Sequence, residues 1–181
     1  MHWLFEWYKG KRIYYEEILR KLYEKKINYL LVGGLAVSMY KVPPRFTMDV
    51  DLIVEFIPEN IEKFISVLAE LGYKPKAPVD PRDLADPLKR EAWIKEKNMK
   101  VFAFYHPGRD HELVDVFVDH PIEFNKMEAG KKVINIKGMG IPIPSKKDLI
   151  TLKKIAGRDE DLLDIKNLEA LPENDELRYG E

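Results

Sequence analysis

Helical spacing of hydrophobic residues marks several segments of the chain. In residues 12–26 the apolar positions recur among glutamates and lysines with the period of an amphipathic helix. A proline near the start and Gly72 just past the end mark a helix over Pro58–Leu71. A further helix is predicted for Ser145–Ile155, with the serine as its N-cap, and a last one for about Glu160–Leu171.

Short apolar runs predict the strands of a sheet. The strands are expected at Tyr29–Val32, Met48–Val54, Lys100–Phe104, Glu112–Val118, Lys131–Lys137 and Ile141–Ile143. A turn at Pro107-Gly108 separates the third from the fourth, which should therefore pair antiparallel. The last two should be peripheral. The proline-rich segment Tyr73–Asp86 is expected to be an irregular surface loop.

A glycine pair follows the first predicted strand. Gly33-Gly34 is succeeded by an apolar helical stretch, Leu35–Tyr40. That stretch must end before Pro43-Pro44, because proline cannot continue a helix and also restricts the residue before it. The predicted order is therefore a strand, a glycine turn and a helix.

The composition is that of an intracellular protein of one domain. With 181 residues, of which 45% are hydrophobic, the chain can bury a substantial core. The formal net charge of −1 gives no overall attraction to nucleic acid or membrane. The absence of cysteine excludes disulfides, thiolate metal sites and cysteine nucleophiles, and fits the reducing cytoplasm. The longest apolar stretch, residues 27–40, is too short to span a bilayer, and we expect no signal peptide.

Carboxylates interrupt two of the predicted strands. Asp49 and Asp51 alternate with apolar residues, so they face the same side with Cα atoms about 7 Å apart. Asp115 and Asp119 similarly share one face of a second acidic strand. If the two strands are neighbours, three carboxylates converge and could bind Mg²⁺, which prefers oxygen ligands. Otherwise these aspartates simply face solvent while the apolar residues face the core.

Such a constellation suits phosphoryl-type transfer. Two divalent ions in an acidic triad can activate an attacking hydroxyl and stabilise the leaving pyrophosphate. Asp115 would then be the base or a bridging ligand near the acceptor. The backbone of Gly33-Gly34 allows close approach, and the helix after it offers unpaired N–H groups to phosphate.

Taken together, these segments resemble a known signature. Gly33-Gly34, then Arg45-x-Thr47-x-Asp49-x-Asp51, then Asp115, is similar to the nucleotidyltransferase superfamily of the DNA polymerase beta type. The likeness is greatest to the branch of minimal nucleotidyltransferases and AbiEii-like abortive-infection toxins. The run 148–164, with its Lys, Gly-Arg and Asp pattern, adds to the resemblance, which spans roughly residues 29–168.

The resemblance implies an α+β fold, a short mixed sheet flanked by helices, with C-terminal helices packed on the core. It implies one nucleotidyltransferase-like domain over residues 1–181, with a core of about 28–170 and an N-terminal helical extension, 1–27. The metal ligands and catalytic residues would be Asp49, Asp51 and Asp115, holding Mg²⁺ or Mn²⁺. The nucleotide-binding residues would be Gly33, Gly34, Arg45, Thr47, Lys153, Arg158 and Asp161.

Two departures from the signature concern the triphosphate. Many members carry Gly-Ser in place of Gly33-Gly34, so a hydroxyl that could bind phosphate is absent. The spacing from the glycines to Asp49 is slightly long because of the extra proline in Pro43-Pro44, which could displace Arg45 and Thr47.

The implied activity is transfer of a nucleoside monophosphate from a nucleoside triphosphate, such as ATP, to an acceptor hydroxyl. The acceptor could be a protein, a transfer RNA end or a small molecule such as an aminoglycoside, because the fold alone does not choose among them. A protein partner could be a second copy of the chain or an antitoxin; no membrane partner is expected.

Three other readings stay open. The same fold could serve as a catalytically inactive binding module within a toxin–antitoxin pair. The aromatic segment 2–8 could instead pack on the body or mediate self-association in a purely structural protein. His106, His111 and His120 could form a metal site with nearby acids, although their spacing fits no helical zinc motif.

Overall fold

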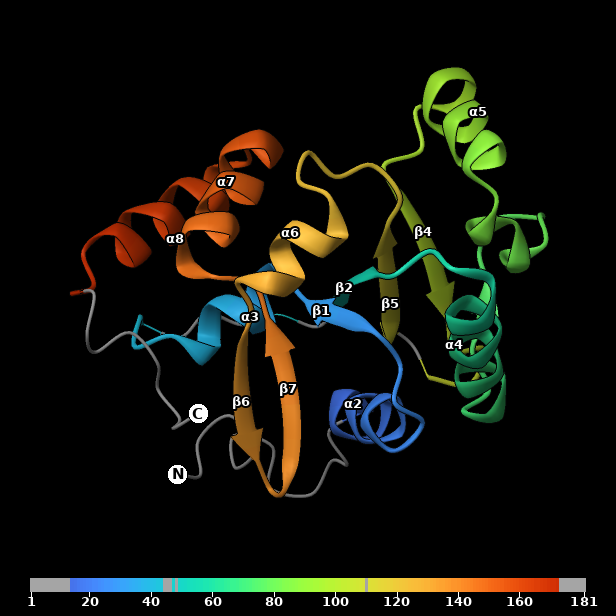
Figure 1. Cartoon of the computed structure of the whole chain (residues 1–181), viewed down its shortest axis with the longest axis horizontal. Coiled ribbons are helices and arrows are strands. Elements are labelled where there is room, and N and C mark those ends of the chain that lie inside the picture. Colours follow the sequence, from blue (N-terminus) through green and yellow to red (C-terminus); the bar gives the residue numbers. More distant parts are fainter. Residues whose placement is uncertain (1–13, 44–46, 48, 110, 173–181) are drawn as a thin grey trace.

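The computed structural model describes residues 14–43, 47, 49–109 and 111–172 (Figure 1). Its helices are α2 (Tyr14–Glu24), α3 (Gly33–Met39), α4 (Pro58–Glu70), α5 (Pro87–Lys97), α6 (Phe124–Ala129), α7 (Lys146–Ala156) and α8 (Asp159–Glu169), with a 3₁₀ helix, η1 (Pro81–Ala85). Its strands are β1 (Tyr29–Leu31), β2 (Val50–Val54), β3 (Lys74–Pro75), β4 (Val101–Tyr105), β5 (Leu113–Phe117), β6 (Lys132–Ile136) and β7 (Met139–Ile143). The aromatic segment 2–8, Arg45 and the tail beyond residue 172 lie outside the described residues.

The main sheet is mixed. Its five strands lie in the order β1-β2-β5-β4-β3. β2 and β5 are parallel, whereas the other neighbours are antiparallel. β6 and β7 form a separate two-stranded hairpin. The six predicted strands are present, including the antiparallel β4–β5 pair, and the α+β class is confirmed. β2 begins at Val50, so Asp49 precedes the strand on which it was expected.

The larger hydrophobic core lies on one face of this sheet. Alternate strand residues, such as Leu52 and Val116, are fully buried there. α4 packs on this face through Phe64, whose ring meets Phe104 edge-on at 6.0 Å. The amphipathic helix α2 contributes Leu22 to the same core, as its helical periodicity predicts.

A smaller cluster lies on the opposite face, over β1 and β2. Ile53 of β2 and Leu30 of β1 are buried there with Met127 of α6. Leu152 of α7 packs against the same cluster. The sheet is therefore covered by helices on both faces near β1 and β2, which positions α7 close to the middle of β2.

Two helices escaped the sequence analysis. α5 begins where Asp86 caps it, accepting hydrogen bonds from the backbone N–H groups of Leu88 at 2.9 Å and Lys89 at 3.4 Å. Only Trp93 of α5 is buried, so the helix has little apolar periodicity to recognise. The same holds for the short α6, in which only Met127 is buried.

The expectation of an irregular loop at Tyr73–Asp86 was wrong in part. This segment contains β3 and η1. β3 forms at the edge of the sheet because its residues pair with β4. The backbone N–H of Lys76, just after β3, also donates a hydrogen bond to β4. An edge strand tolerates Pro75, because one side of it needs no hydrogen-bond donor.

The C-terminal helices form a pair. Ser145 caps α7 as predicted, its hydroxyl accepting from the N–H of Asp148 at 3.2 Å. Gly157 ends α7 with φ of +64°, a conformation that glycine adopts without strain. The sharp turn lets α8 fold back against α7 (Figure 1).

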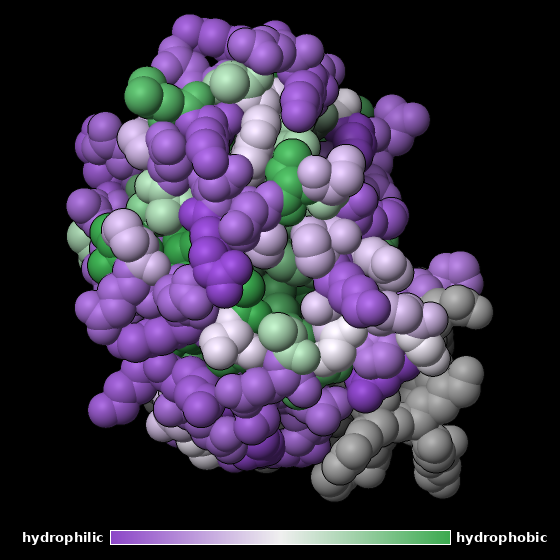
Figure 2. All heavy atoms as spheres, turned by 90° about the vertical axis from the view of Figure 1, so that its right-hand side faces the viewer, coloured by the Kyte–Doolittle hydropathy of each residue, from purple (hydrophilic) through white to green (hydrophobic). Residues whose placement is uncertain are grey.

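Figure 2 shows the side of the molecule that carries α4 and α5. Hydrophilic residues cover most of it, and the hydrophobic areas are small. No helix among the described residues is long and apolar enough to cross a membrane.

We predict that Phe102→Ala destabilises the protein by about 3–5 kcal/mol, the usual cost of emptying a buried aromatic site. Phe102 is fully buried between Trp93 and Phe104, with ring centroids 5.5 and 5.2 Å away. Urea denaturation followed by circular dichroism measures the effect. Leu88→Ala, at a residue 74% exposed, is the control and should change stability by less than about 0.5 kcal/mol. Equal midpoints for the two variants would contradict this packing.

Candidate active site

Asp51 and Asp115 lie side by side in the middle of the sheet. They are register partners on the parallel strands β2 and β5. Their neighbours Leu52 and Val116 are also paired and point into the large core. Because side chains alternate along a strand, both carboxylates project from the opposite face. Burial of the apolar residues therefore holds the two acids together.

The surroundings disfavour ionisation of both acids. Burial raises the pKa of Asp51 to about 7, assisted by the negative charges of Asp115 and Asp49. Burial, followed by the charge of Asp49, raises the pKa of Asp115 to about 6. Arg158 and Lys153 act in the opposite direction on Asp51. Asp115, Lys153 and Arg158 are distant from Asp51 in the sequence, so the fold has gathered charges around one point.

The donor set fits a hard divalent cation. Oδ1 of Asp115 is buried without a hydrogen-bond partner in the described structure. Neither Asp51 nor Asp115 forms an ion pair with a described residue. A cation between these oxygens would supply the missing partner and remove the repulsion. Among the described residues, no three acidic or histidine side chains already surround a common metal position. Asp49 is half-buried and is not part of such a group.

Gly33 stands directly against the Asp51 carboxylate. A Cβ atom at this position would lie 1.9 Å from Oδ2 of Asp51, and φ of Gly33 is +64°. Glycine is therefore required here for two reasons, space and backbone conformation. α3 begins at Gly33, and the preceding Val32 provides no side-chain cap for its first turn. Gly34 is buried within α3.

Lys153 is buried in a set of ion pairs. Its ammonium group lies 2.9 Å from Oδ1 of Asp161 and 2.7 Å from Oδ2 of Asp164. Only 4% of the Lys153 side chain is exposed. The sequence analysis did not assign a role to Asp164. It could have been noticed, because Asp161, Asp164 and Ile165 recur with the spacing of a buried helical stripe.

Asp161 also holds Arg158. The guanidinium group donates from Nε to Oδ2 of Asp161 at 2.8 Å and from Nη2 to Oδ1 at 3.2 Å. Burial alone would raise the pKa of Asp161, but hydrogen bonds from Arg158 and Lys153 lower it to about 2. Asp161 is thus an ionised carboxylate that fixes two cations, and the Arg158 side chain remains more than half exposed.

The remaining predicted residues are distributed as follows. Thr47 is half-buried close to the start of β2, and Arg45 lies outside the described residues. The histidines do not join a metal group in the described part of the chain. His106 packs edge-on against Tyr73 with ring centroids 5.4 Å apart, and His120 lies near Phe56.

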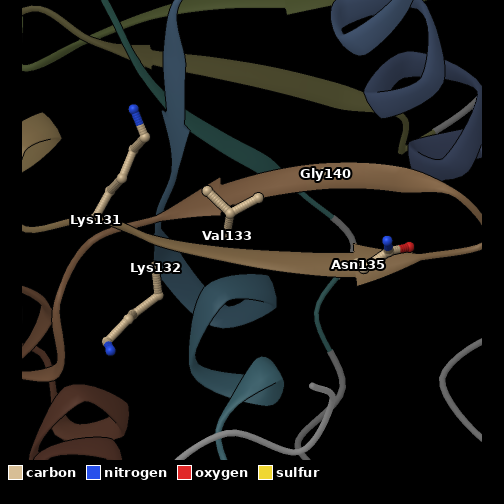
Figure 3. A pocket seen from close by; sticks show the side chains of 5 residues that line it. All are labelled: Lys131, Lys132, Val133, Asn135 and Gly140. Carbon is tan, nitrogen blue, oxygen red and sulfur yellow. The ribbon is translucent and has the colours of Figure 1, made fainter. Parts of the chain in front are cut away.

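One cation at the site was missed by the sequence analysis. The charge of Lys76, at the end of β3, lowers the pKa of Asp115. Its segment was expected to be an irregular loop, so nothing connected it with the acidic strands. A separate hollow at the β6–β7 hairpin contains none of the predicted site residues (Figure 3). It is lined by Lys131, Lys132, Val133, Asn135 and Gly140.

We predict that Asp51→Asn stabilises the metal-free protein at neutral and alkaline pH. The folded-state pKa of about 7 exceeds the ordinary value of 3.8, so the native state favours the protonated carboxyl. The protonated Asp51 carboxyl stabilises the folded state fully below about pH 4, and this stabilisation is lost as the pH rises through 7. The variant should gain on the order of 2 kcal/mol at pH 8 and progressively less towards pH 4. Urea denaturation in EDTA across this range tests the prediction. Asp119→Asn, at an exposed carboxylate, is the control; parallel pH profiles for wild type and Asp51→Asn would refute it.

We also predict that Gly33→Ala costs more stability than Gly138→Ala. Both glycines have positive φ, +64° and +78°, so each substitution carries a backbone penalty of about 1 kcal/mol. Nothing lies within 4 Å of a Cβ at Gly138, whereas at Gly33 the added methyl group collides with Asp51. Thermal or urea denaturation of the two variants isolates this collision. Equal losses of stability would show that the Asp51 carboxylate is not seated against Gly33.

Comparison with known proteins places this geometry in context. Residues 17–159 match the family described as Nucleotidyl transferase AbiEii toxin, Type IV TA system. No curated protein was found to match the sequence.

Several solved structures share the fold. The lincosamide antibiotic adenylyltransferase LnuA, with lincomycin bound, is 18% identical with a TM-score of 0.57, over 91% of this chain and 98% of that one. ANT(2″)-Ia, in complex with adenylyl-2″-tobramycin, is 14% identical with a TM-score of 0.53, over 86% and 85%. An antigenic nucleotidyltransferase-like protein from Paracoccidioides brasiliensis is 16% identical with a TM-score of 0.52, over 86% and 74%.

At these identities the structural likeness establishes the fold, and the sequence match establishes the family. Both agree with the resemblance carried by the glycine pair and the acidic strands. The chain belongs to the AbiEii family, the nucleotidyltransferase toxins of type IV toxin–antitoxin systems.

Proposed function

We propose that this protein transfers a nucleoside monophosphate from a nucleoside triphosphate to an acceptor hydroxyl, using divalent cations held by Asp49, Asp51 and Asp115. The observation that carries the proposal is the adjacency of Asp51 and Asp115, two half-buried carboxylates that form no ion pair with a described residue. Repulsion between them serves no structural purpose, but it creates a strong site for Mg²⁺ or Mn²⁺.

The reaction is an in-line displacement at the α-phosphorus. The acceptor oxygen forms a new bond to phosphorus, the bond to the β-phosphate oxygen breaks, and pyrophosphate leaves. Bound divalent cations would neutralise the phosphate oxygens and make the acceptor hydroxyl easier to ionise. Asp115 takes the proton from that hydroxyl as the general base.

The triphosphate lies along the start of α3 in this proposal. Gly33 and Gly34 allow the phosphates to approach the backbone, and the resemblance adds Thr47 and Arg45 as nucleotide-binding residues. Arg158 is exposed and held by Asp161, so its guanidinium group can meet a phosphate without further ordering. Lys153 is fully buried; it acts through Asp161 and through its charge near Asp51.

As a member of this toxin family, the protein would act in the cytoplasm as the toxin of a toxin–antitoxin pair. Its activity would then be opposed by a cognate antitoxin.

We predict that the protein binds at least one of the four nucleoside triphosphates in a magnesium-dependent manner. The Asp49→Asn, Asp51→Asn double variant should lose at least about tenfold in affinity, because the cations that bridge carboxylates and phosphates are no longer held. Isothermal titration with and without Mg²⁺ measures this, and Asp119→Asn is the matched control.

A second measurement separates an enzyme from an inactive binding module. With a labelled triphosphate and cell extract as acceptor source, wild type should release pyrophosphate and label an acceptor, whereas the double variant should not. Binding without release would identify a binding module. No binding by the wild-type protein would refute the proposed function.

A further inference from the structure

The face of the sheet that carries the acidic pair is open beyond β5. Over β1 and β2 it is covered by α6 and α7, but towards β4 and β3 its residues remain accessible. Ala103 is half-buried and Tyr105 is 37% exposed, whereas Phe102 and Phe104 on the other face are buried. A molecule bound at Asp115 can therefore extend across β4 to the edge of the sheet.

A row of residues crosses the sheet at this level. Asp51 pairs with Asp115, and Asp115 pairs with Ala103. The backbone N–H of Lys76 donates to the carbonyl oxygen of Ala103 at 2.9 Å, continuing the β3–β4 register. Paired residues share a face, so Lys76 projects on the same side as the two aspartates. Its charge acts on Asp115, which agrees with this placement.

Asp115 and Lys76 stand at the two ends of an accessible strip of the sheet face, here called the slot. They are two strands apart, about 10 Å between their backbones, and Ala103 is paired between them in the same row. Tyr105 and Lys74, paired in a neighbouring row, border the slot. This width accommodates a sugar-sized group.

The far side of the slot is cationic. Lys74 and Lys76 are both exposed, and neither forms an ion pair with a residue that the structure describes. By contrast, the nearby cations Arg82 and Lys89 are engaged with Glu62 and Asp83. An unengaged ammonium group on this face is attractive to phosphate and repels an amine.

We propose that the slot is the acceptor subsite and that Lys76 selects an acceptor whose attacking hydroxyl lies on the same molecule as a phosphate group. The proposal rests on the proposed function, because it assigns the acceptor side of that site. The hydroxyl lies at Asp115 and the phosphate contacts the Lys76 ammonium group, with Lys74 beside it. A polyamine acceptor such as tobramycin, the adenylyl derivative of which is bound in one of the similar structures, would meet repulsion there.

The first test is binding, without any transfer reaction. Glycerol 3-phosphate, the smallest suitable alcohol, is titrated into the full-length protein and followed by nuclear magnetic resonance, with glycerol as the uncharged probe. Lys76→Glu should weaken glycerol 3-phosphate binding about tenfold and change the affinity for the uncharged probe glycerol less than twofold. Lys97→Glu, the same charge change at an exposed lysine of α5, should alter the affinity less than twofold. Equal affinities for the two variants would overturn the proposal.

The second test is acceptor choice. Wild type is given labelled triphosphate with adenosine, adenosine 5′-monophosphate, a short oligonucleotide with a free 3′-hydroxyl, or tobramycin. Labelling of the monophosphate or the oligonucleotide, reduced at least tenfold by Lys76→Glu, supports the proposal, and the comparison of these two distinguishes a small molecule from a nucleic acid end. Preferential labelling of adenosine or tobramycin would overturn it while leaving the proposed function intact. Absence of triphosphate binding would instead refute the proposed function.

Discussion

Asp51 and Asp115 face each other across two neighbouring parallel strands, where the apolar residues around them must be buried. Burial and the charges of Asp115 and Asp49 raise the pKa of Asp51, and burial and the charge of Asp49 raise the pKa of Asp115, so the ionised pair opposes folding. Positive charges oppose this repulsion: Lys153 and Arg158 act to lower the pKa of Asp51, and Lys76 acts to lower the pKa of Asp115. The arrangement of the surrounding elements is best understood as a response to this pair of charges.

The C-terminal helix pair brings Lys153 and Arg158 to the sheet. Lys153 lies between Asp161 and Asp164, and Arg158 completes the group, so two positive and two negative charges are balanced. Breaking such a buried set by removing one partner typically costs several kcal/mol. Gly157 permits the sharp reversal that places α8 against α7, and without that reversal the aspartates could not reach Lys153. Stability of the helix pair and charge at the site are therefore linked.

Much of this could be read from the sequence, for identifiable reasons. Alternation of aspartates with apolar residues predicted the acidic strands, and Gly33 stood out because a turn must follow the first strand. The pairing of β2 with β5 required the resemblance to a known family, because no local pattern encodes which strands become neighbours. α5 and α6 were missed, since each buries a single residue, although Asp86-Pro87 is a recognisable helix start. Lys76 was missed as a participant because its role depends on tertiary contacts, whereas the buried helical stripe of α8 could have revealed Asp164.

Lys76 shows how an edge strand can acquire a function that its sequence conceals. β3 is two residues long, contains a proline and one lysine, and is followed by Lys76, features that protect a sheet edge from pairing with another chain. The same lysines cannot all be explained by that protection, since any exposed charge on the edge would serve. What distinguishes Lys76 is its register, because the hydrogen bond to Ala103 places it level with Asp115 and not one residue away, where its side chain would face the core. A shift of one residue would keep the edge protected but remove the cation from the acidic site, so the register itself is the feature that links this edge to the chemistry.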